Sequence, residues 1–357
     1  DPYTKSAYYG ENYNKVTYLG SSGTIYPTPW QFLPQGGAPQ EVLATMPDGY
    51  DLKDMKFVTS TGLEIASKAS SNPHQLILPL QPASGNELYR VYAFVMNADG
   101  TATYCGAMNV MTRSIKTYKA KLVNLGGTYD LTALRTELNN IYNPCGIIWD
   151  LSEDTGFLGD TESQGAITAA LNIDYSDRDA LFREYKYEQQ VLNTRYKEYA
   201  TEKSAYDDKA VYLFALPQKD GHLGDMPIGK QWGYLFGNVE ANVLAHELGH
   251  GKLSLAHTFD HNLDEGTTGP NFNLMDYPVG TELVARQWGS MHDLAMLDPF
   301  QDDADGAATI NPIVKIEPKD FPVKSGEVTF LSLSGLPVSF SDMGKMDEMY
   351  FTSTNVN

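Results

Sequence analysis

The sequence predicts an α+β protein with two folded regions and a short tail, on two observations. First, a chain of 357 residues, 42% of them hydrophobic, can bury one large core or two moderate ones. Second, the pattern changes near residue 115, from β-forming runs separated by turns to strands that alternate with helices. We therefore predict a β-rich, sandwich-like module over 1–115, a domain with a mixed sheet and helices over 116–300, and a linker with a β-rich segment over 301–357.

The N-terminal module carries the signals of strands and turns. Residues 1–40 are rich in Tyr, Gly, Ser and Pro without a helical period, which favours loops and short strands. HQLILPL at 74–80 and ELYRVYAFVM at 87–96 are rich in strand-forming residues. The stretch Asn97 to Gly100 predicts the turn that follows the second of these strands.

The second region opens with a strand and a capped helix. TYKAKLVNL at 117–125 alternates apolar residues with lysines, which is typical of a strand with one exposed face. Asp130 caps a helix that Pro144 ends, and its apolar residues recur at three and four positions. These residues are Leu131, Leu134, Leu138 and Ile141.

Three more strands and two more helices complete the region. The apolar runs at 146–151, 211–216 and 230–236 predict the strands. Ser176 begins a long charged helix that continues to Tyr199 and that we expect to pack on the outside as an insertion. A last helix starts at Thr281 and turns its apolar face inward, with the residues Val284, Trp288, Met291 and Ala295.

A histidine-rich motif, HELGHGKLSLAH at 246–257, follows the third of these strands. Asn238 is the predicted N-cap of its helix, whose apolar stripe is Val239, Val243, Leu244 and Leu248. His246 and His250 lie one turn and about 6 Å apart on one face, so both can bind one metal ion. Glu247 is rotated away from them and lies beside a water on that ion. Among seven histidines in 357 residues, roughly 0.01 such matches are expected by chance.

Zinc needs a third protein ligand and an open position for water. On a straight helix His257 would lie about 10 Å further along the axis than His250, out of reach. We therefore predict that the helix ends after His250, with Gly251 in a left-handed conformation, and that the chain turns back to bring His257 to the metal. The competing ligands are Asp260, His261 and Glu282.

The segment NLMDY at 273–277 adds a resemblance. Together with HELGH and a third histidine, it resembles the metzincin-type zinc peptidases, and the region 116–297 is similar to zincin domains of large secreted bacterial proteins, some of them toxin-like. In that clan the Met forms a tight turn beneath the metal and the Tyr binds zinc or stabilises the intermediate, which implies these roles for Met275 and Tyr277. The chain departs from the clan in two ways: the last two histidines of HELGHGKLSLAH are seven positions apart, where those of metzincins are six positions apart, and Leu253 stands where they have Gly.

The resemblance implies a zincin fold and a secreted, zinc-dependent endopeptidase. A zinc ion on the three histidines would activate water, Glu247 would act as general base, and Tyr277 would donate a hydrogen bond to the oxyanion. We expect the strand at 230–236 to be the sheet edge that binds an extended peptide, through Trp232, Gly233 and Tyr234. The alternative is a zincin-fold binding or adhesion protein that is catalytically silent, or latent because residues 1–40 fill the cleft.

Composition limits the partners and the compartment. The formal charge of −19 disfavours nucleic acid and anionic lipid, so we expect a protein or peptide substrate. No apolar run reaches the roughly 18 residues that a spanning helix requires. The first residues, Asp1 and Pro2, lead us to expect a mature or excised part of an exported protein. Cys105 and Cys145 form one disulfide or remain buried thiols, and we favour the thiols.

Overall fold

The computed structural model of the chain shows a mixed α+β protein with several sheets, as predicted. It describes residues 15–17, 25–27, 30–45, 51–173, 185–219, 221–257, 273–276, 280–283, 285–292, 329–331 and 337–339. Contacts divide the chain into two compact units, and the division falls between Ser114 and Ile115. Among the helices within these ranges, none is long and apolar enough to cross a membrane.

The first unit contains two sheets around one core. The four-stranded sheet has the order β3-β9-β8-β5, in which only the β3–β9 pair is parallel, and the three-stranded antiparallel sheet has the order β4-β7-β6. Leu76, Leu78 and Leu80 alternate inward from β7 and meet Phe57 and Val110 of the other sheet. The strands are β3 Trp30–Pro34, β4 Gln40–Thr45, β5 Met55–Thr59, β6 Lys68–Ala69, β7 Gln75–Leu80, β8 Glu87–Met96 and β9 Ala102–Arg113.

Short elements accompany these sheets. The β8–β9 hairpin turns where the sequence predicts it, at Asn97 to Gly100, with the Asn97 amide donating to Thr101 at 2.8 Å. Two antiparallel pairs are also present, β1 Lys15–Thr17 with β2 Ile25–Pro27 and β15 Thr329–Leu331 with β16 Pro337–Ser339, together with a 3-10 turn at Leu52–Asp54.

The second unit is built on a five-stranded sheet with the order β11-β10-β12-β14-β13. The first four strands are parallel and β13 pairs antiparallel with β14 at the edge. Every residue of β12 is buried, as expected for a parallel strand with helices on both faces. The strands are β10 Lys116–Asn124, β11 Ile147–Asp154, β12 Val211–Leu216, β13 Gly224–Asp225 and β14 Trp232–Phe236.

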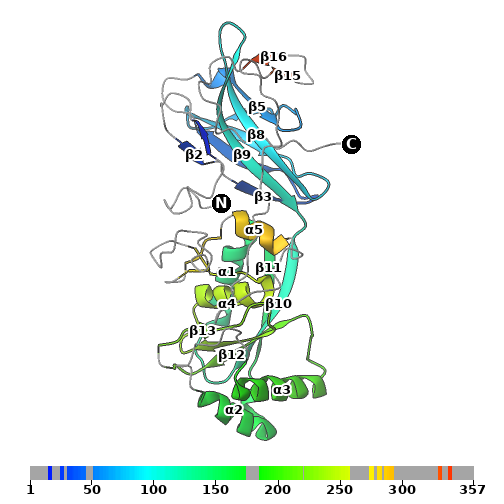
Figure 1. Cartoon of the computed structure of the whole chain (residues 1–357), viewed down its shortest axis with the longest axis vertical. Coiled ribbons are helices and arrows are strands. Elements are labelled where there is room, and N and C mark those ends of the chain that lie inside the picture. The colour runs from blue at the N-terminus through cyan, green and yellow to red at the C-terminus, as the bar shows by residue number, and fades with distance from the viewer. Residues whose placement is uncertain are drawn as a thin grey trace. The chain divides into compact units, whose positions relative to one another are not determined.

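Helices cover both faces of this sheet (Figure 1). On one face α2 Gln164–Leu171 and α3 Tyr187–Glu202 close an aromatic core that includes Tyr196, Tyr212 and Phe214. On the other face α1 Leu131–Tyr142 packs against α4 Ala241–Leu253, and α4 contacts β12, β13 and β14. Short 3-10 turns at Asn143–Cys145, Phe157–Gly159 and Thr161–Ser163 connect these elements.

The predicted start of α1 is confirmed, because the Asp130 carboxylate accepts hydrogen bonds from the amides of Thr132 and Ala133. The prediction of the long charged helix is partly wrong. The helix begins at Tyr187, where the Lys186 amide donates to the Gln189 side chain at 2.8 Å, whereas the predicted start at Ser176 lies outside the described residues. Tyr185 precedes the helix, and the sequence analysis did not predict α2, which is only eight residues long.

The last helix, α5 Ala285–His292, also begins later than predicted. The expected start at Thr281 is wrong because the chain there is extended: Glu282 forms a parallel β-bridge with Asn273 and accepts from the Leu274 amide at 2.7 Å. Trp288 and Met291 are buried as predicted, and the side chain of Val284 and all of Ala295 lie outside the described residues. Cys145 is a free, buried thiol whose pKa is raised by burial.

Candidate metal centre

The helix α4 carries the motif and packs against the sheet. It begins at Ala241, and the predicted N-cap Asn238 is wrong: that residue pairs with Thr128 in a parallel β-bridge, and Glu240 is the N-cap. The apolar residues Val239, Val243, Leu244 and Leu248 are buried as predicted. From α1, the Tyr142 hydroxyl donates to the carbonyl oxygen of Ala245 at 2.7 Å, which fixes the helix one residue before the motif.

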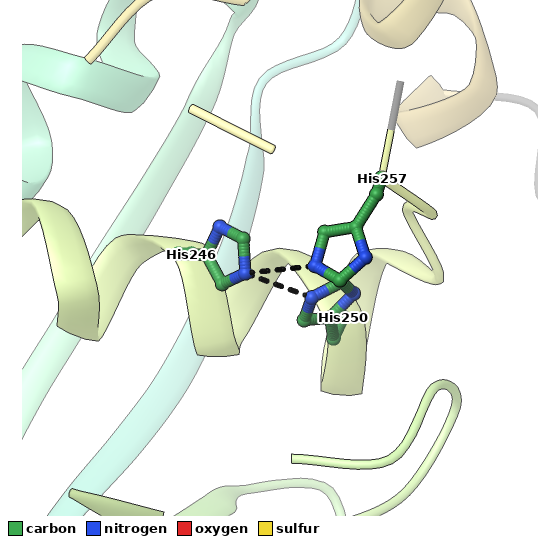
Figure 2. A group of neighbouring side chains, drawn as sticks. All are labelled: His246, His250 and His257. Carbon is green, nitrogen blue, oxygen red and sulfur yellow. Dashed lines mark hydrogen bonds between the residues drawn. The ribbon is translucent and has the colours of Figure 1, made fainter. Parts of the chain in front are cut away.

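Three imidazoles meet inside the fold, each with only 1–2% of its surface exposed. His250 Nε2 lies 2.9 Å from His246 Nε2, and His257 Nε2 lies 3.3 Å from it (Figure 2). Nitrogen ligands at about 2.0–2.1 Å from a tetrahedral metal are roughly 3.3 Å apart, so this spacing suits a single ion. Within the described ranges, His246, His250 and His257 form a group of three side chains that could hold a metal ion.

The other ring nitrogens explain why these atoms can converge. His246 Nδ1 lies 2.7 Å from the carbonyl oxygen of Leu274, and His250 Nδ1 lies 2.7 Å from that of Leu255. Because a carbonyl oxygen only accepts, both Nδ1 atoms carry the hydrogen, and in neutral rings the Nε2 lone pairs are left facing one another. Two lone pairs at 2.9 Å repel unless a cation lies between them. The donor set therefore fits a metal ion, and backbone carbonyls orient its ligands in the usual way.

His257 reaches the other two histidines by a turn that begins at Ser254. This residue adopts the left-handed conformation, with φ 53° and ψ 37°, and the amides of Ser254 and Leu255 both donate to the carbonyl oxygen of Gly249. The prediction that the helix ends at Gly251 is therefore wrong, because the helix continues to Leu253. The expectation that the chain turns back and brings His257 beside the first two rings agrees with the geometry.

Gly251 has a different role from the predicted one. It lies within the helix, where a Cβ would overlap the Met226 methyl group and lie 2.9 Å from the carbonyl oxygen of Lys230. Its lack of a side chain makes room for a neighbour and does not serve the turn. Of the competing ligands, Glu282 lies in the β-bridge with Asn273 and outside the histidine group, and Asp260 and His261 lie outside the described residues.

Glu247 is 6% exposed and contacts the edge strand β13. A Cβ placed on Gly224 would overlap its Oε1 and lie 2.8 Å from its Cδ, so the carboxylate lies directly against the backbone of the strand. A buried carboxylate between the motif helix and a sheet edge is suitably placed to act on a chain bound at that edge.

The segment of the predicted Met turn lies under the motif helix. Asn273, Leu274, Met275 and Asp276 are buried, and Met275 Sδ lies 2.8 Å from the position that a Cβ on Gly249 would take. Asn273 Oδ1 accepts from the Met275 amide at 2.9 Å, as in a tight turn. Tyr277 lies outside the described residues.

The predicted peptide-binding strand is not at the edge of the sheet, which corrects the assignment of Trp232, Gly233 and Tyr234. β14 is paired on both sides, with β12 and with β13. The aromatic side chains of Trp232 and Tyr234 are buried in the core under α3, and the space beside Gly233 is filled by Met226, whose Sδ lies 2.9 Å from a Cβ built there. The edge strand is β13 instead.

Two glycines of this site were not singled out from the sequence. Gly249 occupies a variable position of the HExxH pattern, and Gly224 belongs to a two-residue strand inside a turn-rich stretch. Glycine within a helix is unfavourable by about 1 kcal/mol relative to alanine, and that cost was the available signal that Gly249 makes room for another group.

Comparisons with known proteins leave the family open. No protein-family model and no curated protein matches the chain. Among solved structures, it is similar to CopC from Methylosinus trichosporium, with 17% identity over 24% of this chain and 86% of that one, and a TM-score of 0.19. The chain is also similar to the copper resistance protein PcoC from Escherichia coli, with 16% identity over 24% of this chain and 92% of PcoC, and a TM-score of 0.17. A sialyltransferase from Photobacterium damsela is 9% identical over 53% of this chain and 36% of the sialyltransferase, with a TM-score of 0.21. These scores are too low to indicate a shared fold, so the function has to be inferred from the site.

Proposed function

We propose that the chain is a zinc-dependent endopeptidase of zincin type. The observation that carries the proposal is the convergence of three buried imidazole Nε2 atoms. Those of His246 and His250 are 2.9 Å apart, and the Nδ1 atoms of the same two rings are hydrogen-bonded to carbonyl oxygens. Three neutral imidazoles and a free fourth position are the ligand set of catalytic zinc, whereas structural zinc sites use four protein ligands. The proposed location outside the cell rests on the resemblance to zincin domains of secreted bacterial proteins.

The residues divide the work of peptide hydrolysis among them. His246, His250 and His257 would hold a zinc ion, which would supply a Lewis acid that lowers the pKa of water toward about 7 and polarises a carbonyl. Glu247 takes the proton of the attacking water and passes it to the leaving amine. Tyr277 donates a hydrogen bond to the developing oxyanion. Met275 packs against the helix at Gly249 and supports the turn that carries the two histidines of the motif.

The edge strand offers the place where an extended peptide binds. Gly224 pairs with Leu235, and the Phe236 amide donates to the Leu223 carbonyl oxygen at 3.0 Å. In an antiparallel ladder the hydrogen-bonded positions alternate, so the N–H and C=O of Gly224 point away from β14, toward the outer side of the strand. A substrate strand added there pairs with Gly224, next to the Glu247 carboxylate.

The test compares two carboxylate variants of one helix. Glu247→Gln is expected to keep one zinc per chain and to lose about 10²- to 10⁴-fold in the cleavage rate of a peptide library. Glu240→Gln, at the exposed N-cap of the same helix and without a side-chain capping bond, serves as the control and should retain both properties. Unchanged cleavage by zinc-loaded Glu247→Gln would show that the peptidase assignment is wrong. A native protein that binds zinc and cleaves no peptide would favour the silent binding or adhesion protein.

A further inference from the structure

The edge strand β13 meets the motif helix where Gly224 lies against Glu247. The three atoms nearest to a Cβ on Gly224 all belong to Glu247: Oε1, which it would overlap, and Cδ and Cγ, each at 2.8 Å. Gly224 does not adopt a positive φ, so an alanine there would meet no backbone strain. The Glu247 side chain is thus the obstacle to a side chain at this position.

Glu247 cannot avoid such a side chain by a small adjustment. Because its Cγ is as close as its Cδ, rotation of the carboxylate alone leaves the overlap in place, and the whole side chain from Cγ outward has to turn. Glu247 is also 6% exposed, so the space into which it can turn is limited.

The strand cannot recede either, because three contacts hold it. The buried Asp225 accepts a hydrogen bond from Gln189 Nε2 of α3 at 3.0 Å, on the face of the sheet away from α4. The Phe236 amide donates to the carbonyl oxygen of Leu223. Met226, 1% exposed, fills the spaces left by two further glycines, Gly233 in β14 and Gly251 in α4.

We propose that Gly224 is a positioning residue for the general base. Its missing side chain lets the edge strand lie directly on Glu247, so that one contact sets both the place of the carboxylate and the distance of the bound peptide from it. This inference rests on the proposed peptidase function, but the contact itself is independent of that function. A substitution at Gly224 therefore displaces Glu247 whether or not the protein cleaves peptides.

A double-mutant cycle tests the contact with two readouts. The proteins are the native chain, Gly224→Ala, Glu247→Ala and the double variant, all full length. Gly224→Ala is expected to lower the melting temperature by several degrees and kcat by about 10²-fold, with KM and zinc content little changed. Alanine at 247 lacks Cγ, Cδ and Oε1, the three atoms nearest to the new Cβ, so adding Gly224→Ala to Glu247→Ala should cost less than half of that melting shift and no further kcat.

The control is Gly159→Ala, because a Cβ at Gly159 meets nothing within 4 Å and this residue is in the same unit. It should leave the melting temperature and kcat unchanged. If Gly224→Ala shifts the melting temperature equally in the native chain and in the Glu247→Ala variant, the inference is overturned. If the native chain cleaves no peptide while the melting shifts are coupled, the peptidase proposal fails and the contact stands. If cleavage is present and the shifts are additive, the contact fails and the peptidase proposal stands.

Discussion

His246 donates from Nδ1 to the carbonyl oxygen of Leu274 over 2.7 Å, a hydrogen bond between residues 28 positions apart. It joins the motif helix to the turn of Met275 and leaves the other ring nitrogen facing His250 and His257. A ring fixed in this way loses little rotational freedom when it binds a metal. The same bond makes the turn part of the candidate metal centre, although none of the turn residues described belongs to the group of three histidines.

Removal of metal should lower the stability of the second unit. A ligand at 1,000 times its dissociation constant stabilises the fold by about 4 kcal/mol, which for a unit of this size is on the order of 10 °C in melting temperature. We expect this shift when the native protein is treated with a chelator and followed by calorimetry. His257→Ala should show a much smaller shift and bind zinc weakly, whereas exposed His74→Ala in the first unit should behave like the native protein. Equal chelator shifts for both variants would contradict the assignment of His257 as a ligand.

Gly249→Ala should destabilise the protein even though alanine is the better helix former. The added Cβ would lie 2.8 Å from Met275 Sδ and 3.3 Å from the Tyr142 hydroxyl, both inside the core. Such overpacking costs about 1–3 kcal/mol, measurable by urea unfolding. Gly165→Ala in α2 is the matched control, because a Cβ there meets nothing within 4 Å, and it should be neutral or slightly stabilising. A neutral Gly249→Ala would mean that Met275 does not pack under the motif.

Gln287→Ala should loosen the Met275 turn. The side-chain amides of Asn273 and Gln287 form two reciprocal hydrogen bonds of 2.9 Å, both residues are buried, and Asn273 Oδ1 also accepts from the Met275 amide. Loss of the partner amide costs about 1–3 kcal/mol. Hydrogen exchange at the Met275 amide should accelerate more than at the amides of β12, the fully buried strand of the same unit. Uniform acceleration would indicate global destabilisation instead of a local role.

Alkaline pH should destabilise the second unit through Tyr212. Burial raises the pKa of Tyr212 to about 12, and its hydroxyl accepts from the Asp207 amide at 2.7 Å and donates to the Asp207 carbonyl at 3.1 Å. The folded state then holds the proton more tightly than the unfolded state, whose tyrosine has a pKa near 10. Its contribution to stability is therefore complete below about pH 10 and is lost as the pH rises toward about 12.

Tyr212→Phe removes the hydroxyl proton whose pKa differs between the folded and unfolded states. The variant should lose some stability at neutral pH, because the two hydrogen bonds with Asp207 disappear, but its urea midpoint should fall less steeply between about pH 10 and 11.5 than that of the native protein. Parallel slopes in this range would show that Tyr212 does not contribute to the alkaline transition.

Local sequence patterns were sufficient to predict most elements of the second unit. The Asp130 cap, the fully apolar β12 and the spacing of the histidines each express a local rule of backbone geometry, and the structure agrees with them. The edge strand β13 follows no such rule. β13 has two residues, too few to show alternation, and its place at the edge depends on pairing with β14. That pairing moved the predicted sheet edge from β14 to β13.

The turn to His257 was predicted at the wrong residue for a related reason. Glycine is the usual residue at positive φ, so Gly251 was the local choice. In the structure the left-handed residue is Ser254, and Gly251 is required by the side chain of Met226, a neighbour 25 residues earlier in the chain. Where a glycine makes room for a distant side chain, no local pattern reveals its purpose.

The rings of His246 and His250 are oriented by main-chain oxygens, those of Leu274 and Leu255. Any apolar residue of similar volume at 255 or 274 offers the same carbonyl oxygen. The orientation of the two imidazole rings therefore depends on the path of the backbone and not on these side chains. Distant relatives could therefore replace these two leucines and still bring the same three imidazole nitrogens together. Their similarity would be visible in the backbone structure after the sequence between the histidines had changed.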